Sequence, residues 1–284
     1  MNNLKTVALL ALMSTLVWFI AATLVGGAAG LWIGFGLAAL LNLGAYFFSD
    51  KMAIAAAKAV PIPDDQLPQL HEMVERLAGE AGIPVPRLYY IDSMQPNAFA
   101  TGRNPKHAVI AVTKGILAML DKEELEGVLA HELAHVTNRD ILISSIAAML
   151  AAALSIFARM TLFGGRRRGG GPVELVVGLL GIILAPIAAM ILKSAISRSR
   201  EYEADATGSQ LSGAPLQLAS ALAKIGRGTR EHPMRVNDAV SQLFIADPTV
   251  ALNARAAMSR MFSTHPPIED RIARLQEMAA GRPR

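Results

Sequence analysis

The sequence predicts a predominantly α-helical membrane protein with four apolar helices, two of which either span or re-enter, and an α+β domain with a small β-sheet. Three observations support this fold class. Hydrophobic residues make up 52% of the 284 positions. Many of them fall in long apolar blocks, and one spanning helix needs about 20 such residues. The polar segments between the blocks carry the periodicities of helices and short strands.

The first apolar block runs from Thr6 to Ser49 and contains no charged residue. Its length suffices for two spanning helices. Three glycines near its middle suit the turn between them: Gly26, Gly27 and Gly30. A cleaved signal peptide is the alternative, but its short apolar core would not be followed directly by a second apolar stretch over residues 31–48. We therefore expect residues 1–49 to form a transmembrane hairpin.

Two further apolar blocks, Ile141–Phe163 and Val173–Leu192, approach spanning length. Arg159 interrupts the first block and Glu174 the second. Arg159 is near the end of its block, where a long basic side chain can reach the interface. We expect residues 141–193 to form a second helix pair that either spans or re-enters, with buried core helices as the alternative.

The composition excludes several classes of function. The chain has no cysteine, so disulfides are excluded and any zinc site must use histidine and carboxylate ligands. A net charge of +4 is too small to indicate nucleic acid, and the basic residues are not interleaved with aromatic ones. Much of the basic excess lies beside apolar blocks, which indicates contact with anionic lipid. We therefore expect a lipid bilayer, and no nucleic acid, among the partners.

The first polar segment predicts two helices and a small sheet. Apolar residues recur at helical spacing over residues 66–80, and Gly82 then ends the helix. Three short extended pieces rich in β-branched and aromatic residues follow: 87–91, 98–102 and 108–113. Asp121-Lys-Glu-Glu124 fits a capping box, and the apolar pattern after it predicts a helix to about Asn138.

The second polar segment, after the second apolar pair, is helical in pattern throughout. The expected helical stretches are Ser197–Leu211, Leu216–Ile225, Val250–Met261 and Pro266–Met278.

The strongest chemical signal is His131-Glu132-Leu133-Ala134-His135. On a helix, positions four apart share a face, so both imidazoles can reach one metal ion. Glu132 lies about 100° around the helix from His131, where it can hold a reacting water. Imidazole suits zinc, and a catalytic zinc site has three protein ligands and one open position. The alternative, two solvated histidines on an ordinary helix, fits poorly with the charged residues that bracket this one.

A third ligand is expected from Ser199-Arg-Glu-Tyr-Glu-Ala-Asp205. Glu201 and Asp205 are four apart, so a helix puts both carboxylates on one face. Glu201 can bind the metal while Asp205 accepts the free N–H of a ligating histidine. Glu203 points elsewhere on the helix and is the weaker candidate. The alternative is that these charged residues form an ordinary solvated face of the helix. Because the zinc site needs a third ligand, this alternative is disfavoured.

The order of these residues along the chain constrains its path through the membrane. The two histidines precede the second apolar pair and Glu201 follows it, so the chain between them must cross an even number of times or re-enter. We therefore expect residues 50–140 and 194–284 to form two parts of one catalytic domain.

These residues resemble the HtpX family of membrane zinc metalloproteases, which are related to the CAAX prenyl endopeptidases. The resemblance covers nearly the whole chain. It rests on the apolar hairpin and on four segments: Pro96–Gly102, His131–Asp140, Ser197–Asp205 and Thr264–Pro267. It implies a zincin-like domain of the gluzincin type that binds one zinc ion per chain.

The resemblance assigns roles to particular residues. The metal ligands would be His131, His135 and Glu201. The catalytic residues would be Glu132 as the base, with His265 and Arg271 lining the site. The supporting residues around the ligands would be Asp205 and Asn138. The substrate would pair with an exposed strand edge formed by Asn97, Ala98, Phe99 and Ala100. Ordinary alternatives are a helix start at His265, a solvated Arg271 and a core position for Phe99.

The resemblance also implies a function, which is hydrolysis of misfolded or damaged membrane proteins during quality control in the bacterial inner membrane. With four spans, seven basic residues near apolar ends share the catalytic side: Lys5, Lys51, Lys58, Arg139, Lys193, Arg198 and Arg200. Three arginines, residues 166–168, would lie on the other side. Since cytoplasmic segments are enriched in basic residues, the catalytic side is expected to face the cytoplasm. The three arginines keep the re-entrant alternative open.

The sequence is also compared with three rival functions by what each would require of the zinc motif or its substrates. An intramembrane protease would carry its zinc motif within an apolar span, whereas charged residues bracket this motif on both sides. A prenyl-processing protease shares the chemistry and is separated only by its substrates. A membrane scaffold with a structural zinc would have no need of Glu132. Substrate preference and oligomeric state are left open by the sequence.

Overall fold

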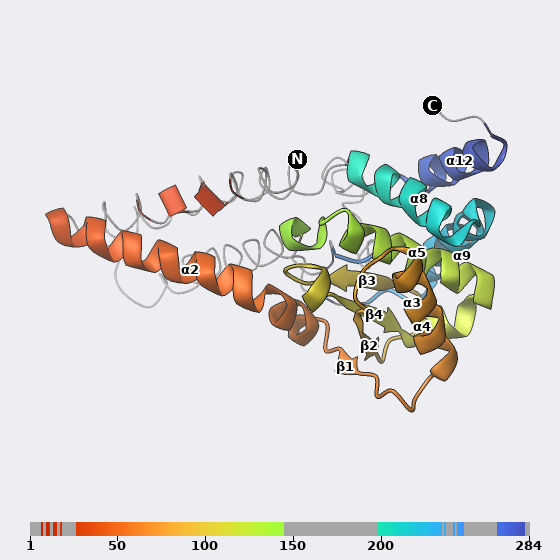
Figure 1. Ribbon diagram of the computed structural model, residues 1–284, viewed down its shortest axis with the longest axis horizontal. Coiled ribbons are helices and arrows are strands. Elements are labelled where there is room, and N and C mark those ends of the chain that lie inside the picture. The colour runs from red at the N-terminus through yellow and green to blue at the C-terminus, as the bar shows by residue number, and fades with distance from the viewer. Residues whose placement is uncertain are drawn as a thin grey trace.

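The structure is a computed structural model that describes residues 27–144, 198–234, 243–246 and 266–281. It also describes some single residues: Val7, Leu10, Ala11, Ser14, Thr15, Trp18, Val236 and Ser241. Helices surround one small sheet, and one long helix extends away from them (Figure 1). The mostly helical architecture with a small sheet is the one expected from the sequence.

The sheet is mixed and has the strand order β1-β2-β4-β3. Its strands are β1 (Val60–Pro61), β2 (Arg87–Ile91), β3 (Ala98–Thr101) and β4 (Val109–Thr113). β2 and β4 are parallel, while β1 and β3 pair antiparallel at the two edges. The three expected strands are confirmed to within one residue at each end. β1 was missed because two residues, one of them proline, carry no alternating pattern.

The helices around the sheet are α3 (Pro68–Glu80), α4 (Lys114–Met119), α5 (Lys122–Thr137), α8 (Arg198–Ser212), α9 (Pro215–Glu231) and α12 (Ile268–Ala279), with a short 3₁₀ turn at Pro105–His107. Four of them match the expected helices to within about two residues, whereas α9 runs six residues past its expected end and the short helix α4 was not expected. The expected capping box of α5 is confirmed. The Glu124 N–H donates to the Asp121 carboxylate at 2.9 Å, and the Asp121 N–H donates to the Glu124 carboxylate at 3.1 Å. The stretch expected over residues 250–261 lies outside the described residues.

α2 (Gly27–Ala56) contains a stretch long and apolar enough to cross a membrane, Gly27–Gly44. Hydrogen bonds join α2 to described residues that precede it, among them one from the Asn42 amide to the Leu10 carbonyl at 3.4 Å. The Trp18 indole N–H donates to the Leu31 carbonyl at 3.1 Å, and the Asn42 amide donates to the Ser14 hydroxyl at 2.5 Å. These contacts pair the two segments in antiparallel order, as in a hairpin. In the described part of the chain α2 is the one candidate span, and nearly all of the expected pair at 141–193 lies outside the described residues.

α2 continues past the expected hairpin boundary at residue 49, to Ala56. Asp50 and Lys51 are charged, and the polar segment was therefore expected to begin there. Instead Asp50 is buried and pairs with Arg87 at the start of β2, at 3.4 Å. Ala53 packs with Phe99 of β3 in a small apolar cluster. The end of the apolar helix is therefore part of the folded domain.

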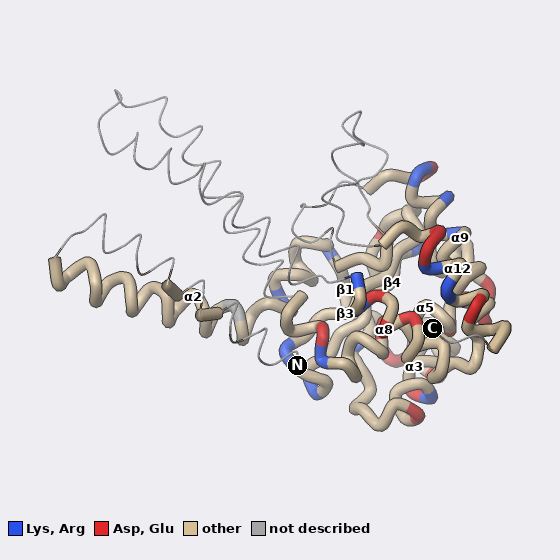
Figure 2. The backbone as a smooth tube through the Cα atoms, turned by 90° about the horizontal axis from the view of Figure 1, so that it is seen from above, with Lys and Arg blue, Asp and Glu red and all other residues tan. Residues whose placement is uncertain are grey.

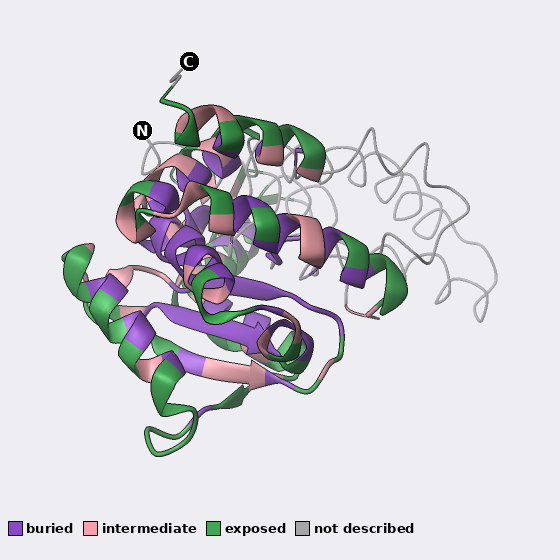
Figure 3. Ribbon diagram, turned by 90° about the vertical axis from the view of Figure 1, so that its right-hand side faces the viewer, coloured by how far each residue is buried: buried purple, intermediate pink, exposed green. Residues whose placement is uncertain are grey.

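α5 lies at the centre of the domain, against both β3 and α8 (Figure 3). Val128, Leu129 and Leu133 of α5 are fully buried in the main apolar core with Ile110 of β4. Charged residues gather on the domain, whereas most of α2 carries none (Figure 2). This arrangement fixes α5 rigidly and places its motif next to α8.

Candidate active site

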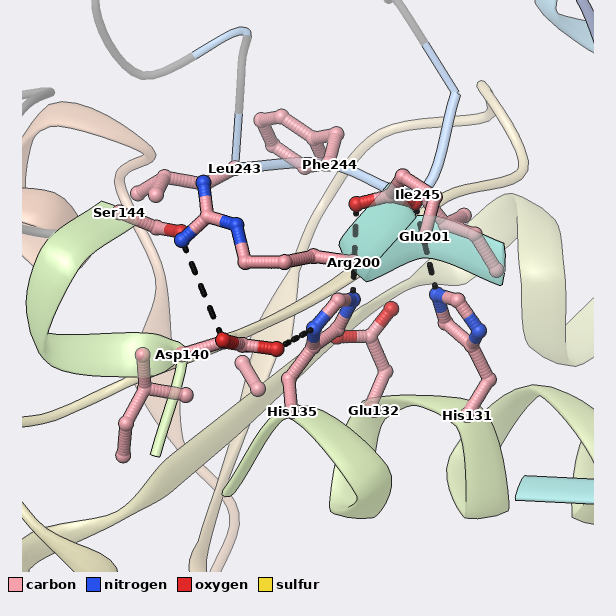
Figure 4. A pocket seen from close by; sticks show the side chains of 12 residues that line it. His131, Glu132, His135, Asp140, Ser144, Arg200, Glu201, Leu243, Phe244 and Ile245 are labelled. Atoms are coloured by element: carbon pink, nitrogen blue, oxygen red, sulfur yellow. Dashed lines mark hydrogen bonds and ion pairs between the residues drawn. The ribbon is translucent and has the colours of Figure 1, made fainter. Parts of the chain in front are cut away.

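α5 presents His131 and His135 on one face, and α8 brings Glu201 opposite them (Figure 4). The Nε2 atoms of His131 and His135 lie 3.8 and 3.7 Å from the two oxygens of Glu201. Two atoms that each bind a tetrahedral zinc at about 2.0–2.1 Å lie roughly 3.4 Å apart. One ligand atom from each residue lies within 4.8 Å of the others. The three residues therefore fit a zinc ion in donor type and spacing.

Close contact between α8 and α5 puts Glu201 in this position. Gly208 of α8 lies against the α5 backbone, where an added Cβ would come within 2.8 Å of the His131 Cα and N atoms. Only a residue without a side chain permits this approach. Glu201 itself is buried, so its carboxylate faces the histidines rather than solvent.

Each histidine is held through its other ring nitrogen by an aspartate. The His131 Nδ1 lies 2.9 Å from the Asp205 carboxylate, and the His135 Nδ1 lies 3.4 Å from that of Asp140. Such contacts orient a ligating imidazole and leave Nε2 available for the metal. The structure thus brings Asp205 to His131, in the arrangement proposed from the sequence.

Asp140 is the residue whose carboxylate faces His135, and the supporting role expected of Asn138 stays a prediction. Asn138 is the C-cap of α5, and Arg139 after it has a φ of 59°. The Asp140 N–H donates back to the His135 carbonyl at 2.9 Å, and the Arg139 N–H donates to the Val136 carbonyl at 3.1 Å. This pair of bonds is the Schellman motif. The turn carries the chain past Asn138 and returns Asp140 to the site.

Arg271 of α12 lies behind the candidate ligands. Its guanidinium donates to both Asp205 oxygens, at 2.8 and 2.6 Å, and to the Ile245 carbonyl at 3.2 Å. Its side chain is 0% exposed. Arg271 is not among the residues that line the described pocket, but its guanidinium lies 3.5 Å from the Glu201 carboxylate and 3.4 Å from the His131 ring nitrogens. Its expected role in the site stays a prediction. The arginine holds the pKa of Asp205 down at about 2, although burial alone would raise it.

Glu132 lies beside the two histidines and is 2% exposed. Burial raises the pKa of its carboxyl above the usual range, while the charges of His131 and His135 oppose the rise. The Ala100 N–H donates to this carboxylate. A carboxylate whose pKa is raised toward neutrality is suited to accept and return a proton.

For His135, burial and the neighbouring charges of opposite sign act on the pKa in the opposite directions from those at Glu132. Burial lowers the pKa of its imidazole, but the Asp140 hydrogen bond and the Glu201 charge outweigh burial and raise it to about 9. In the metal-free protein His135 is therefore protonated at neutral pH. A metal ion must displace that proton.

β3, where substrate pairing was expected, is an edge strand of the described sheet, but its free edge is partly occupied. The Ile245 N–H donates to the Ala98 carbonyl at 2.9 Å, and the Asn97 amide donates to the Ala246 carbonyl at 2.8 Å. Phe99 packs edge-on against Phe244 in the core, the ordinary alternative noted for it. Of the four residues proposed for substrate contact, Ala100 alone lines the described pocket.

The candidate ligands open into a small pocket (Figure 4). Its lining comprises Ala100, His131, Glu132, His135, Asp140, Ile141, Ser144, Arg200, Glu201, Leu243, Phe244 and Ile245. The sequence analysis gave no role in the site to Asp140 or Arg200. Asp140 ends the motif segment His131–Asp140, and Arg200 directly precedes the expected ligand Glu201. These positions were the sequence signal that could have identified both residues. His265 lies outside the described residues, and its proposed role stays a prediction.

Comparisons with known proteins agree with the motifs. Residues 64–279 match Peptidase family M48. A Protease HtpX homolog from Persephonella marina is 49% identical over 98% of both chains. One from Syntrophobacter fumaroxidans is 49% identical over 98% of this chain and 99% of its own. These relatives confirm the resemblance inferred from the sequence.

A solved structure shares the fold. The crystal structure of S. mikatae Ste24p aligns over 94% of this chain with a TM-score of 0.50 and 18% identity. This chain spans 62% of the length of that one. The family match covers most of the chain, including α5, α8 and every candidate ligand. The chain therefore belongs to peptidase family M48.

Proposed function

We propose that this chain is a membrane-anchored zinc endopeptidase of the HtpX type. The observation that carries the proposal is the convergence of the His131 and His135 Nε2 atoms on the Glu201 carboxylate, beside the buried Glu132. The relatives named Protease HtpX homolog support the assignment along nearly the whole chain. An exposed apolar helix, α2, provides the anchor.

His131, His135 and Glu201 would hold the zinc ion, with Asp205 and Asp140 keeping the two imidazoles oriented. Bound zinc supplies Lewis acidity, which polarises the scissile carbonyl and makes water more acidic. The fit rests on an all-nitrogen and oxygen donor set, the one available to a chain without cysteine.

Glu132 acts as the general base in this proposal. Its carboxylate takes a proton from the attacking water as the water oxygen bonds to the carbonyl carbon. The same carboxyl then gives that proton to the amide nitrogen as the C–N bond breaks. The Ala100 N–H holds the carboxylate in place. Arg271 supports the candidate ligands through its hydrogen bonds to Asp205 and its ion pair with Glu201 at 3.5 Å.

The substrates in this proposal are misfolded or damaged membrane proteins, and the site faces the cytoplasm from the bacterial inner membrane. Substrates that come from the membrane are supported by the direct packing of the end of α2 on β3, beside the pocket. A chain segment leaving the bilayer along α2 would therefore reach β3. Main-chain pairing at the part of the β3 edge that Ile245 and Ala246 do not occupy would give affinity with little dependence on sequence.

The test is cleavage of casein by the purified, detergent-solubilised protein, with Glu132→Gln as the diagnostic variant. We expect Glu132→Gln to keep about one zinc per chain and to lose cleavage by at least about 100-fold, because the base is gone while the ligands stay. Glu123→Gln is the matched control, since Glu123 is exposed on the same helix. Normal cleavage by Glu132→Gln would refute the mechanism.

A further inference from the structure

Arg200 of α8 is buried beside the candidate metal ligands without adequate hydrogen-bond partners. It precedes Glu201, is 5% exposed and lines the same pocket. Among the residues that the structure describes, neither terminal nitrogen of its guanidinium has a hydrogen-bond partner, and both atoms are shielded from solvent. A buried polar group left in this state costs free energy, and in a native protein it calls for an explanation.

Asp140 only partly compensates the charge. Its nearest oxygen is 3.9 Å from the Arg200 Nη1, beyond hydrogen-bond range. Its other oxygen faces the His135 Nδ1 at 3.4 Å. Burial lowers the pKa of the Arg200 guanidinium despite the nearby charges of Asp140 and Glu201, which raise it. The cation is therefore short of acceptors.

The second buried arginine of the site shows the contrast. Arg271 donates to both oxygens of Asp205 and to the Ile245 carbonyl. Its hydrogen-bonding capacity is used by the protein itself, which suits a structural role. In Figure 4 the Arg200 guanidinium instead lies on the side of Asp140 and Ser144, and a dashed line marks its ion pair with Asp140 at 3.9 Å.

We propose that Arg200 is a substrate-binding residue whose guanidinium donates hydrogen bonds to a main-chain oxygen of the peptide in the pocket. That oxygen belongs to an internal carbonyl or to a terminal carboxylate, and the planar fork of arginine suits either. The cavity has a volume of about 30 Å³, enough for a carbonyl group or one or two waters. The inference rests on the proposed peptidase function and adds a subsite to it.

The test compares Arg200→Gln and Arg200→Lys with Arg198→Gln, a control with the same loss of charge at an exposed position on the same turn. Peptide cleavage is measured as kcat and KM, together with zinc content. We expect Arg200→Gln to raise KM by about 10-fold or more with zinc retained, since hydrogen bonds from a charged group contribute about 1.5–3 kcal/mol. Arg200→Lys should recover part of the loss, and Arg198→Gln should change neither constant.

Two peptides identify the acceptor. The first peptide has both ends blocked and is cleaved internally. The second peptide ends at the residue that follows the scissile bond, and the carboxylate of that last residue is free. A rise in KM for both peptides assigns an internal carbonyl. A rise confined to the second peptide assigns a terminal carboxylate.

Thermal unfolding separates binding from a structural role. Because Arg200 lacks acceptors, the binding role predicts that Arg200→Met leaves the Tm of the metal-free protein unchanged or raises it. A lowered Tm of Arg200→Met would overturn the proposal. Loss of zinc from Arg200→Gln, or an unchanged KM of that variant with an altered pH profile, would also overturn it. Each of these results would show that Arg200 acts through Asp140 and His135. A wild type that holds zinc but cleaves neither peptide would instead refute the peptidase function.

Discussion

Gly208 in α8 lies so close to the backbone of His131 in α5 that a Cβ at this position would come within 2.8 Å of it. The distance between α5 and α8, the two helices that carry the candidate ligands, is therefore one that only glycine at position 208 allows. Glu201, less than two turns earlier in α8, depends on this spacing for its distance from the histidines.

Gly208→Ala should therefore damage both the fold and the metal site. The backbone cannot yield as a flexible side chain would, so we expect a loss of about 1–3 kcal/mol in the free energy of unfolding. We also expect weaker zinc binding, because α8 moves away from α5. Urea unfolding and zinc competition titration measure the two effects.

Gly79→Ala is the matched control, because a Cβ at Gly79 meets nothing within 4 Å. Alanine within a helix is favoured over glycine by roughly 1 kcal/mol. Gly79→Ala should therefore raise stability slightly and leave zinc affinity unchanged. Similar behaviour of the two variants would contradict the close contact.

Asp205→Asn should weaken zinc binding and destabilise the protein. The variant keeps the size of the side chain but removes the charge that orients His131 and neutralises the buried Arg271. We expect a zinc affinity lower by about 10–100-fold. An uncompensated buried arginine costs about 3–5 kcal/mol of stability. Asp270→Asn, at an exposed position on α12, is the control and should change neither quantity.

Zinc affinity should depend on pH through His135. In the metal-free protein the pKa of this imidazole is about 9, above the usual value of about 6.5. Zinc must displace the proton below pH 9, so affinity should fall by about tenfold for each pH unit below 9. Asp140→Asn removes the main hydrogen bond that raises this pKa and should shift the dependence to lower pH. A pH-independent affinity for wild type would contradict the assignment.

Arg139→Gly should stabilise the protein. Arg139 has a φ of 59° at the turn after α5, a left-handed conformation that costs a residue with a Cβ about 1–2 kcal/mol. After the entropy of the added glycine is counted, we expect a gain of about 0.5–1 kcal/mol by urea unfolding. Arg139→Ala keeps the Cβ while removing the charge, so it should show no gain. Equal stability of the two variants would mean that charge, and not backbone strain, is responsible.

Local patterns predicted most of the domain. The strands at 87–91, 98–101 and 109–113 follow from β-branched and aromatic content, and the start of α5 follows from the reciprocal bonds of Asp121 and Glu124. The ligand set followed from helical spacing in two short motifs. These features depend on residues that are close together in the sequence.

Features that depend on distant contacts were not predictable. Asp50 is charged but buried, because it meets Arg87 from another segment. Asn97 bonds to Ala246, 149 residues away, so the occupied edge of β3 has no local signature. The contact of Asp140 with His135 depends on a left-handed residue that is not glycine. Each case requires tertiary geometry that a short pattern does not encode.

The most direct test of the central claim is the zinc content per chain of Glu201→Gln beside that of Glu203→Gln. Both residues lie on α8, but Glu201 is buried against the histidines and Glu203 is exposed. The account predicts about one zinc per chain in wild type and in Glu203→Gln, and zinc binding strongly weakened or lost in Glu201→Gln. Full zinc content in Glu201→Gln, or loss in Glu203→Gln, would contradict it.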